Sequence, residues 1–135
     1  MGNKILDTSV IAKWFCEEEG SDRAQKYLDE FGQGKYGITV PTLLFYEIGN
    51  MLLNKKIETI RVSEIMSRLQ NVSFNIVDIG YEAFRKIFQN AQELSITFYD
   101  AAYVTLMQKE DAEFITADRK LYEKLHRKFS AVTLL

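Results

Sequence analysis

The chain has 135 residues and a mass of 15.7 kDa, and 47% of its residues are apolar and 27% charged. This length and composition suit one globular domain over residues 1–135 better than two domains or a disordered chain. Nineteen acidic residues against 17 lysines and arginines give a net charge of -2, which argues against a strongly basic module that binds nucleic acid by bulk electrostatics. A nucleic-acid enzyme whose acids hold metal ions remains possible, so the positions of the acids matter.

The sequence also limits the compartment. A single cysteine, Cys16, cannot form an intramolecular disulfide or a multi-cysteine zinc site. Asp7 lies where a signal peptide would need its apolar core, and no uninterrupted apolar run approaches the roughly 18 residues that cross a bilayer. We therefore expect a cytoplasmic protein without a membrane partner.

Short β-prone runs alternate along the chain with longer segments of helical periodicity. The predicted strands are residues 4–6, 37–40, 74–77, 113–116 and 131–134. The predicted helices are residues 10–15, 21–31, 42–54, 63–69, 81–94, 99–108 and 119–128. This alternation predicts an α/β fold with a parallel sheet covered by helices on both faces.

Three helix starts support this register. Asp7 or Thr8 is expected to cap the helix after the first strand, and Pro41 to open the helix that follows the second. Asp118 is expected to cap the helix that runs through Leu121.

Two aspartates lie directly after predicted strands. Asp7 follows Lys4-Ile5-Leu6, and Asp118 follows residues 114–116 with one alanine between. Both therefore belong at the carboxyl edge of a parallel sheet, where ligands bind in folds of this class. Taken singly, each could serve only as a helix cap.

Two further acids lie within apolar helices. Glu47 is surrounded by apolar residues in the predicted helix 42–54, and Asp100 by those of the helix 99–108. An ionised carboxylate in such surroundings costs several kcal/mol unless it is paired or binds a metal. A buried salt bridge is the structural alternative, but no lysine or arginine stands three or four positions from Asp100.

These four acids suggest one convergent pocket. Clustered carboxylates raise each other's pKa, and a divalent cation allows several of them to stay ionised. Oxygen-only ligands select Mg²⁺ or Mn²⁺, and the lone His126 lies among basic residues, which argues against a histidine-rich centre. Such a site suits hydrolysis of a phosphodiester bond.

Four motifs in order resemble the PIN-domain ribonucleases, and within them the VapC-type toxins of toxin-antitoxin pairs. The motifs are Ile5-Leu6-Asp7-Thr8-Ser9, Pro41-Thr42-Leu43 with Tyr46-Glu47-Ile48-Gly49-Asn50, Tyr99-Asp100-Ala101-Ala102-Tyr103, and Thr116-Ala117-Asp118-Arg119-Lys120-Leu121. They span nearly the whole chain, and together they are far more specific than any one alone.

The resemblance implies a Mg²⁺-dependent (or Mn²⁺-dependent) endoribonuclease, with a three-layer α/β/α domain and a four- or five-stranded, mainly parallel sheet. It also implies an RNA substrate, a small cognate antitoxin protein and a homodimer or dimer of dimers. The catalytic and metal-binding quartet it implies is Asp7, Glu47, Asp100 and Asp118. Ser9 and Thr116 match hydroxyl positions that orient these acids or a metal-bound water, and Asn50 matches a frequent polar position one helical turn after the glutamate.

Basic residues near the motifs are candidates for RNA binding. Arg119 and Lys120 follow Asp118 directly, ahead of further cations at 124, 127 and 128, and Lys13 follows the first motif closely. The alternative is a solvated helix face, because basic runs on terminal helices are common.

Other functions remain possible at this point. A phosphoacceptor signalling domain would use Asp7 or Asp78 after a strand, but it lacks a second acid at Thr8 and leaves Glu47 and Asp100 unexplained. A noncatalytic scaffold that binds RNA or protein would not need the intact quartet. A flap-cleaving DNA nuclease would need further acids and a helical arch, for which this chain has little room.

Overall fold

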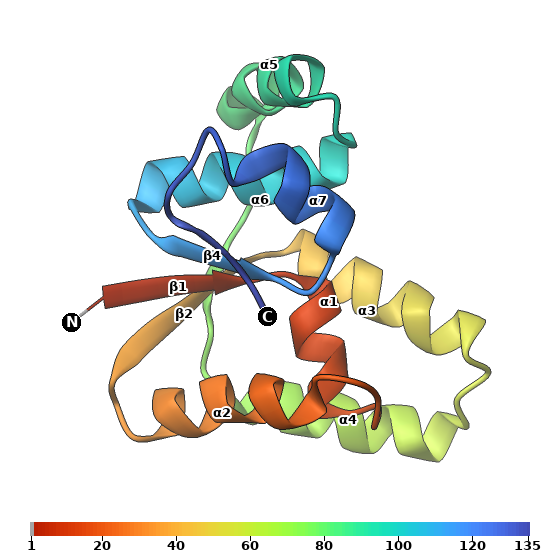
Figure 1. The fold of residues 1–135 in the computed structure, drawn as a ribbon. Coiled ribbons are helices and arrows are strands. Elements are labelled where there is room, and N and C mark those ends of the chain that lie inside the picture. Colours follow the sequence, from red (N-terminus) through yellow and green to blue (C-terminus); the bar gives the residue numbers. More distant parts are fainter. Residues whose placement is uncertain (1) are drawn as a thin grey trace.

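Five short strands form one parallel sheet in the order β3-β2-β1-β4-β5 in the computed structural model, which describes residues 2–135. Figure 1 shows β1, β2 and β4 at the centre of the molecule. The strands are β1 (Gly2–Leu6), β2 (Tyr36–Pro41), β3 (Asn75–Val77), β4 (Glu113–Thr116) and β5 (Val132–Leu134). All four neighbouring pairs are parallel. The predicted α/β class and the five predicted strands are confirmed.

Within residues 2–135, seven α-helices and two short 3-10 helices connect these strands. They are α1 (Thr8–Ile11), η1 (Ala12–Trp14), α2 (Ser21–Gly32), α3 (Leu43–Asn54), α4 (Thr59–Asn71), η2 (Tyr81–Ala83), α5 (Phe84–Leu94), α6 (Phe98–Glu110) and α7 (Arg119–Leu125). Helix α4 begins at Thr59, before the predicted start at residue 63. The pattern misses this first turn because it is exposed and shows no apolar periodicity; Ile60, for example, is 70% exposed.

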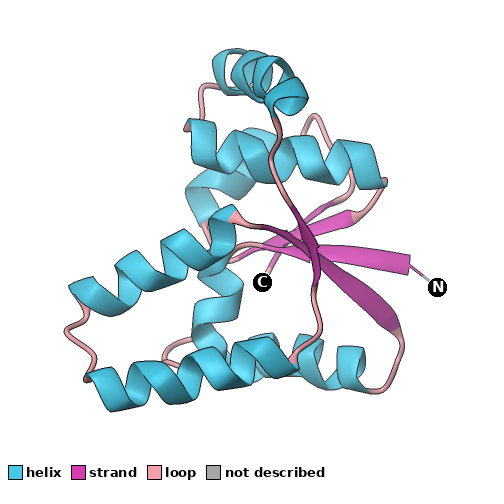
Figure 2. Ribbon diagram, turned by 180° about the vertical axis from the view of Figure 1, so that it is seen from behind, coloured by secondary structure: helices cyan, strands magenta, loops and turns pink. Residues whose placement is uncertain are grey.

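The helices cover both faces of the sheet, which gives the expected three layers (Figures 1 and 2). Strand residues alternate between the two faces: Ile5 and Phe114 pack with residues of α6 and α7, whereas Leu6 and Ile115 pack with residues of α1 to α4. Helix α5 packs mainly on α6. The two helices α3 and α4 extend together beyond the sheet, as the view from behind also shows (Figure 2).

Two predicted helix starts need correction. Pro41 is the last residue of β2, paired with Val77, and Thr42 stands at the N-cap of α3. Asp7 stands at the N-cap position of α1 but makes no side-chain cap hydrogen bond, because its carboxylate accepts bonds from other side chains. By contrast, Asp118 does cap α7: its Oδ1 accepts from the backbone N–H of Leu121 at 3.1 Å.

The strand order defines the position of the site. From β1 the chain adds β2 and β3 on one side, and then returns to place β4 and β5 on the other. The connection therefore reverses direction between β1 and β4, and ligands of open parallel sheets bind outside the carboxyl ends of the strands at such a point. None of the helices in residues 2–135 is long and apolar enough to cross a membrane.

Candidate active site

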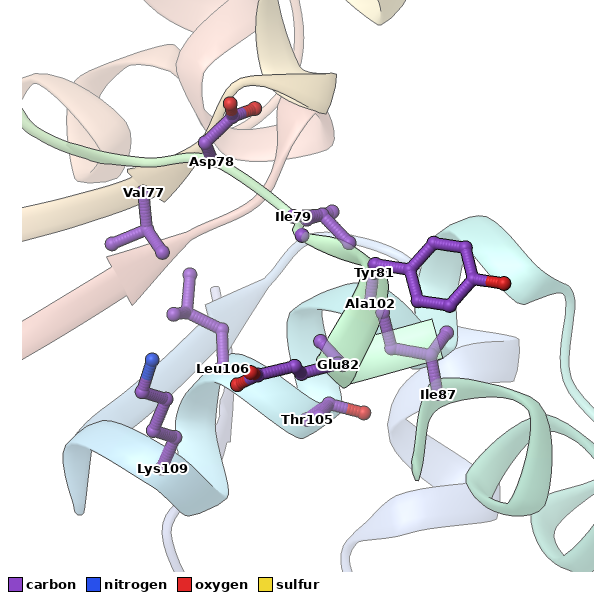
Figure 3. A pocket seen from close by; sticks show the side chains of 12 residues that line it. Val77, Asp78, Ile79, Tyr81, Glu82, Ile87, Ala102, Thr105, Leu106 and Lys109 are labelled. Atoms are coloured by element: carbon purple, nitrogen blue, oxygen red, sulfur yellow. The ribbon is translucent and has the colours of Figure 1, made fainter. Parts of the chain in front are cut away.

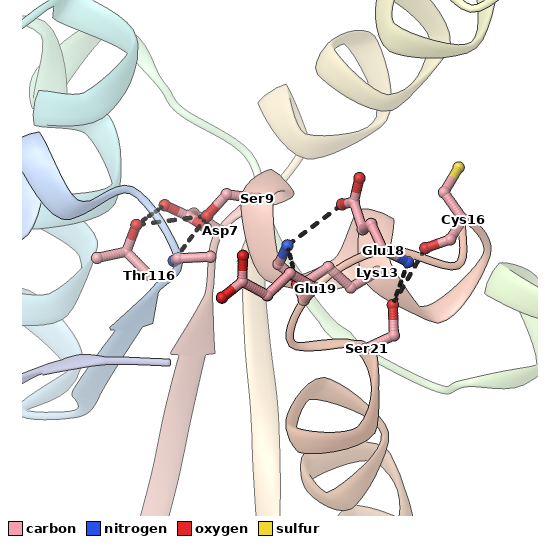
Figure 4. Close-up of polar contacts among 9 residues, drawn as sticks. Asp7, Ser9, Lys13, Cys16, Glu18, Glu19, Ser21 and Thr116 are labelled. Carbon is pink, nitrogen blue, oxygen red and sulfur yellow. Dashed lines mark hydrogen bonds and ion pairs between the residues drawn. The ribbon is translucent and has the colours of Figure 1, made fainter.

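Asp7 is the buried centre of the polar site. It follows β1 beside the end of β4, and only 7% of its surface is exposed. Thr116 Oγ1 donates to Asp7 Oδ2 at 2.6 Å, and Ser9 Oγ donates to Asp7 Oδ1 (Figure 4). The two hydroxyls therefore hold both carboxylate oxygens in place.

Backbone amides fix these two hydroxyls in turn. The N–H of Ala117 donates to Ser9 Oγ at 2.8 Å, and the N–H of Asp118 donates to Thr116 Oγ1 at 3.1 Å. Each hydroxyl accepts one bond and donates another, so its donor orientation toward Asp7 is set. The turn after β4 and the first turn of α1 thus form one network around a single carboxylate.

A second network holds Glu47 on α3. Tyr103 Oη on α6 and Thr8 Oγ1 on α1 each lie 2.8 Å from Glu47 Oε1 and donate to it. Tyr103 is almost fully buried, and its ring stacks on Phe114 at 5.9 Å between centroids. The sequence motifs contain Thr8 and Tyr103, but neither was predicted to contact Glu47: Thr8 was expected only as a possible helix cap, and Tyr103 had no predicted role. The signal was present, because Tyr103 lies one helical turn after Asp100, on the side of α6 that packs toward the sheet.

Asp100 and Asp118 lie at the start of α6 and α7. The N-cap Thr97 accepts a hydrogen bond from the backbone N–H of Asp100 at 3.0 Å, which places the Asp100 carboxylate in the first turn, where the helix dipole favours negative charge. Both acids line a cavity of about 290 Å³ with Lys120 and Lys124. The Nζ of Lys124 donates to the Ser95 carbonyl oxygen at 2.6 Å, which ties α7 to the loop before α6.

The N-cap of α6 provides a stability test for this part of the site. Changing Thr97 to alanine should lower the free energy of unfolding by about 1 kcal/mol, because the N–H of Asp100 loses its acceptor. Urea denaturation measures the change. Thr59→Ala at the first position of α4 is the matched control and should stay within about 0.5 kcal/mol of the wild type. An equal loss in both variants would contradict the capping role.

The pKa shifts of Asp7 and Asp100 reflect burial first and the charges of neighbouring acids second. The pKa of Asp7 is raised to about 6, mainly by burial and in smaller part by the charge of Asp100, while the hydrogen bonds from Ser9 and Thr116 oppose the rise. Burial also raises the pKa of Asp100, and the charges of Asp118 and Glu47 add to this, while the hydrogen bond with Thr97 and the charge of Lys124 oppose it. The four elements α1, α3, α6 and α7 therefore bring a concentration of negative charge to one edge of the sheet.

This donor set fits a cation that keeps part of its water shell. In residues 2–135, no three histidine, cysteine, aspartate or glutamate side chains are close enough together to form a complete cage. Mg²⁺ in proteins is held through one or two carboxylates and several waters, so it needs no such cage. Carboxylates and hydroxyls are hard oxygen ligands, and the only histidine, His126, is exposed and stacks on Tyr122.

The other predicted residues lie around this centre. Asn50 is exposed on α3, one turn after Glu47. Lys13 and Arg119 line a cavity on one side of Asp118, and Lys120 lines the cavity with Asp100 on the other. Asp78 follows β3 and accepts a bond from Thr42 Oγ1 at 3.1 Å. Because β2 separates β3 from β1, Asp78 does not supply the paired acid that a phosphoacceptor site needs.

A more apolar cavity of about 450 Å³ lies elsewhere, between the segment after β3 and helices α5 and α6 (Figure 3). Its lining includes Val77, Ile79, Ile87 and Leu106, with Lys109 at one side. None of the four acids lines it. The polar networks, and not this cavity, therefore define the candidate active site.

The fold and the site define a class: a parallel α/β protein with four acids at the point where the strand order reverses. The PIN domain family matches residues 4–125, and the chain belongs to this family. The chain is 26% identical to Ribonuclease VapC3 of Pyrobaculum aerophilum over 125 residues, covering 89% of this chain and 92% of that protein.

Solved structures show the same fold. A crystal structure of the protein PAE2754 from Pyrobaculum aerophilum has a TM-score of 0.69 and 19% identity, covering 91% of this chain and 79% of that one. A chain from a toxin-antitoxin complex of Klebsiella pneumoniae has a TM-score of 0.68 and 16% identity, covering 96% and 95%. The resemblance to the PIN fold that the motifs indicated is confirmed.

Proposed function

We propose that this protein is a divalent-metal-dependent endoribonuclease that acts as the toxin of a toxin-antitoxin pair. The observation that carries the proposal is the set of four acids at the reversal of strand order in a PIN-domain chain. The similarity to a protein named as a ribonuclease over most of the chain supports the choice of RNA. The structural likeness to a toxin-antitoxin complex supports the biological role.

In this proposal Asp7 and Asp100 are the principal metal ligands, and Glu47 and Asp118 complete the acidic pocket. Bound Mg²⁺ or Mn²⁺ would supply an activated water and neutralise charge on the phosphoryl group. The protein's own groups hold the geometry: Ser9 and Thr116 orient the Asp7 carboxylate through the hydrogen bonds described above. Rigid carboxylates are what such a site needs, because mobile ligands would place the attacking water imprecisely.

Removing divalent metal tests this proposal directly. Purified protein in EDTA should leave single-stranded RNA intact, and excess Mg²⁺ or Mn²⁺ should restore cleavage, because the acidic pocket alone repels a phosphodiester. Gel electrophoresis of a labelled RNA measures both states. Cleavage that continues at full rate in EDTA would contradict the proposal, as would the absence of any cleavage with either metal.

The partners are proposed on the same basis. A small antitoxin should bind this chain and inhibit it, and the adjacent upstream reading frame should encode a DNA-binding segment with an amphipathic tail. Co-expression and copurification of the two proteins test this. The homodimer or dimer of dimers stays a prediction, which size-exclusion chromatography with light scattering measures.

A further inference from the structure

A polar cavity of about 320 Å³ shares none of its lining residues with the cavity that Asp100 and Asp118 line. Three cationic residues line it: Lys13 after α1, Arg23 on α2 and Arg119 at the start of α7. One acid, Glu19, also lines it. Cationic side chains outnumber acidic ones here, whereas the cavity with Asp100 and Asp118 is lined by two acids and two lysines.

Lys13 is held in place rather than free in solvent. Its side chain is only 15% exposed, and its Nζ donates to Glu18 Oε1 at 3.3 Å and to the carbonyl oxygen of Glu19 at 2.8 Å (Figure 4). An ammonium group has three N–H donors, so one donor remains for a ligand in the cavity.

Gly20 allows the side chains of Arg23 and Lys13 to approach each other. It is buried and has a left-handed φ of +87°. A Cβ at this position would lie 3.2 Å from Arg23 Nη2 and 3.6 Å from Lys13 Cδ. The Arg23 guanidinium and the aliphatic part of the Lys13 side chain therefore flank the same point, and a Cβ on Gly20 would push the guanidinium aside. Because both cationic residues line one cavity, an anion bound there would be attracted by each of them.

The cavity adjoins the candidate active site through two short connections. Ala117 lines the cavity and donates its N–H to Ser9 Oγ, which contacts Asp7. Arg119 follows Asp118 directly, and the next residue, Lys120, lines the other cavity with Asp100 and Asp118. Consecutive cations at the start of α7 therefore line two different cavities, each next to Asp118 in sequence or in its lining.

We propose that the cavity lined by Lys13, Arg23 and Arg119 binds a backbone phosphate of single-stranded RNA, next to the phosphate that is cleaved. This inference rests on the proposed ribonuclease function and extends it to Arg23, which lies in none of the four motifs. Guanidinium groups bind phosphate oxygens through paired N–H donors. A strand bound here and at Lys120 crosses the acidic pocket between two cationic contacts, which offset the repulsion from the carboxylates.

The test measures RNA affinity in an Asp7→Asn background, in which the RNA stays intact. Fluorescence anisotropy with a short labelled single-stranded RNA in Mg²⁺, over a series of KCl concentrations, gives the Kd and its salt dependence. Adding Arg23→Gln should weaken binding about threefold to tenfold and make the slope of log K against log salt shallower by about 0.7, the value for one lost phosphate contact on a single strand. Arg85→Gln, an equal charge change on α5 that lines a different cavity, should change neither.

Two outcomes would overturn the assignment to RNA. One is an unchanged Kd and salt slope in Arg23→Gln; if inorganic phosphate then raises the melting temperature of the wild type but not of this variant, the cavity binds a free anion instead. The other is an equal change in Arg85→Gln. Cleavage by the wild type with Mg²⁺ is measured alongside. If the wild type does not cleave RNA, the ribonuclease proposal is overturned. If the wild type cleaves RNA but Arg23→Gln does not change RNA binding, only this inference is overturned.

Discussion

Replacing Asp7 with asparagine should reduce RNA cleavage on the order of 10³-fold while the protein keeps its fold. Asparagine has the same shape but carries no charge, so it cannot hold a divalent cation against water. Its packing should survive, because Ser9 and Thr116 are hydroxyls that can accept a hydrogen bond as well as donate one. Cleavage rates with saturating Mg²⁺, together with circular dichroism, measure the two expectations.

Asp78→Asn is the matched control for this change. It makes the same substitution at an exposed aspartate that follows β3, the strand at the edge of the sheet. We expect it to cleave at the wild-type rate. Retained cleavage in Asp7→Asn, or an equal loss in Asp78→Asn, would contradict the role proposed for Asp7.

The stability of the metal-free protein should also depend on Asp7. Its folded-state pKa of about 6 lies above the ordinary 3.8, so the folded protein holds this proton more tightly than the unfolded chain. Unfolding free energy should therefore fall as pH rises from about 4 to about 6, by up to about 3 kcal/mol from this group. In EDTA, Asp7→Asn should be at least as stable as the wild type at pH 7.5. Urea denaturation measures both. An unfolding free energy that rises between about pH 4 and about pH 6, or an Asp7→Asn variant less stable than the wild type, would contradict the prediction.

The free-energy cost of ionising Asp7 is related to the proposed metal binding. A buried carboxylate that is unfavourable without metal becomes favourable when a cation is bound, because the cation stabilises the ionised form. The hydroxyls of Ser9 and Thr116 reduce the cost but do not remove it, since the pKa stays raised. Metal should therefore stabilise the wild-type fold more than that of Asp7→Asn.

The sequence was sufficient to predict the strands and the edge at which Asp7 and Asp118 lie. Both aspartates follow short apolar runs, and the carboxyl ends of parallel strands share one edge. The burial of Glu47, which is only half-buried in the structure, was less predictable. The apolar run around it predicted a buried helix, but α3 extends beyond the sheet, and Tyr46 beside Glu47 is 77% exposed. Whether an apolar helix is buried depends on what packs against it, which the pattern does not specify.

Contacts between distant segments could not be predicted in the same way. The bond between Tyr103 and Glu47 joins residues 56 positions apart, and it depends on how the strand order places α3 and α6. The proximity of Lys13 and Arg23 depends on the left-handed turn at Gly20. Neither contact has a periodic signal, because each results from the strand order and from a single loop conformation.

The network around Glu47 leads to a second large effect on cleavage. Glu47→Gln should reduce the rate about 100-fold, because the pocket loses one of its four negative charges. Tyr103→Phe should reduce it about tenfold, in the range found when a residue that orients a metal ligand is removed. The phenylalanine ring keeps the stacking on Phe114, so the loss of stability should be only about 1 kcal/mol.

Combining the two changes separates a positioning role from a structural one. If Tyr103 acts through Glu47, the double variant should cleave about as slowly as Glu47→Gln alone, because the hydroxyl then orients a group that no longer binds the cation. The Mn²⁺ concentration at half-maximal binding, measured by calorimetry, should rise in Tyr103→Phe and not in the matched control Tyr122→Phe on α7. Losses that multiply to about 1000-fold would mean that Tyr103 affects cleavage independently of Glu47. The positioning of Glu47 by Tyr103 and Thr8 would then be a feature of packing alone.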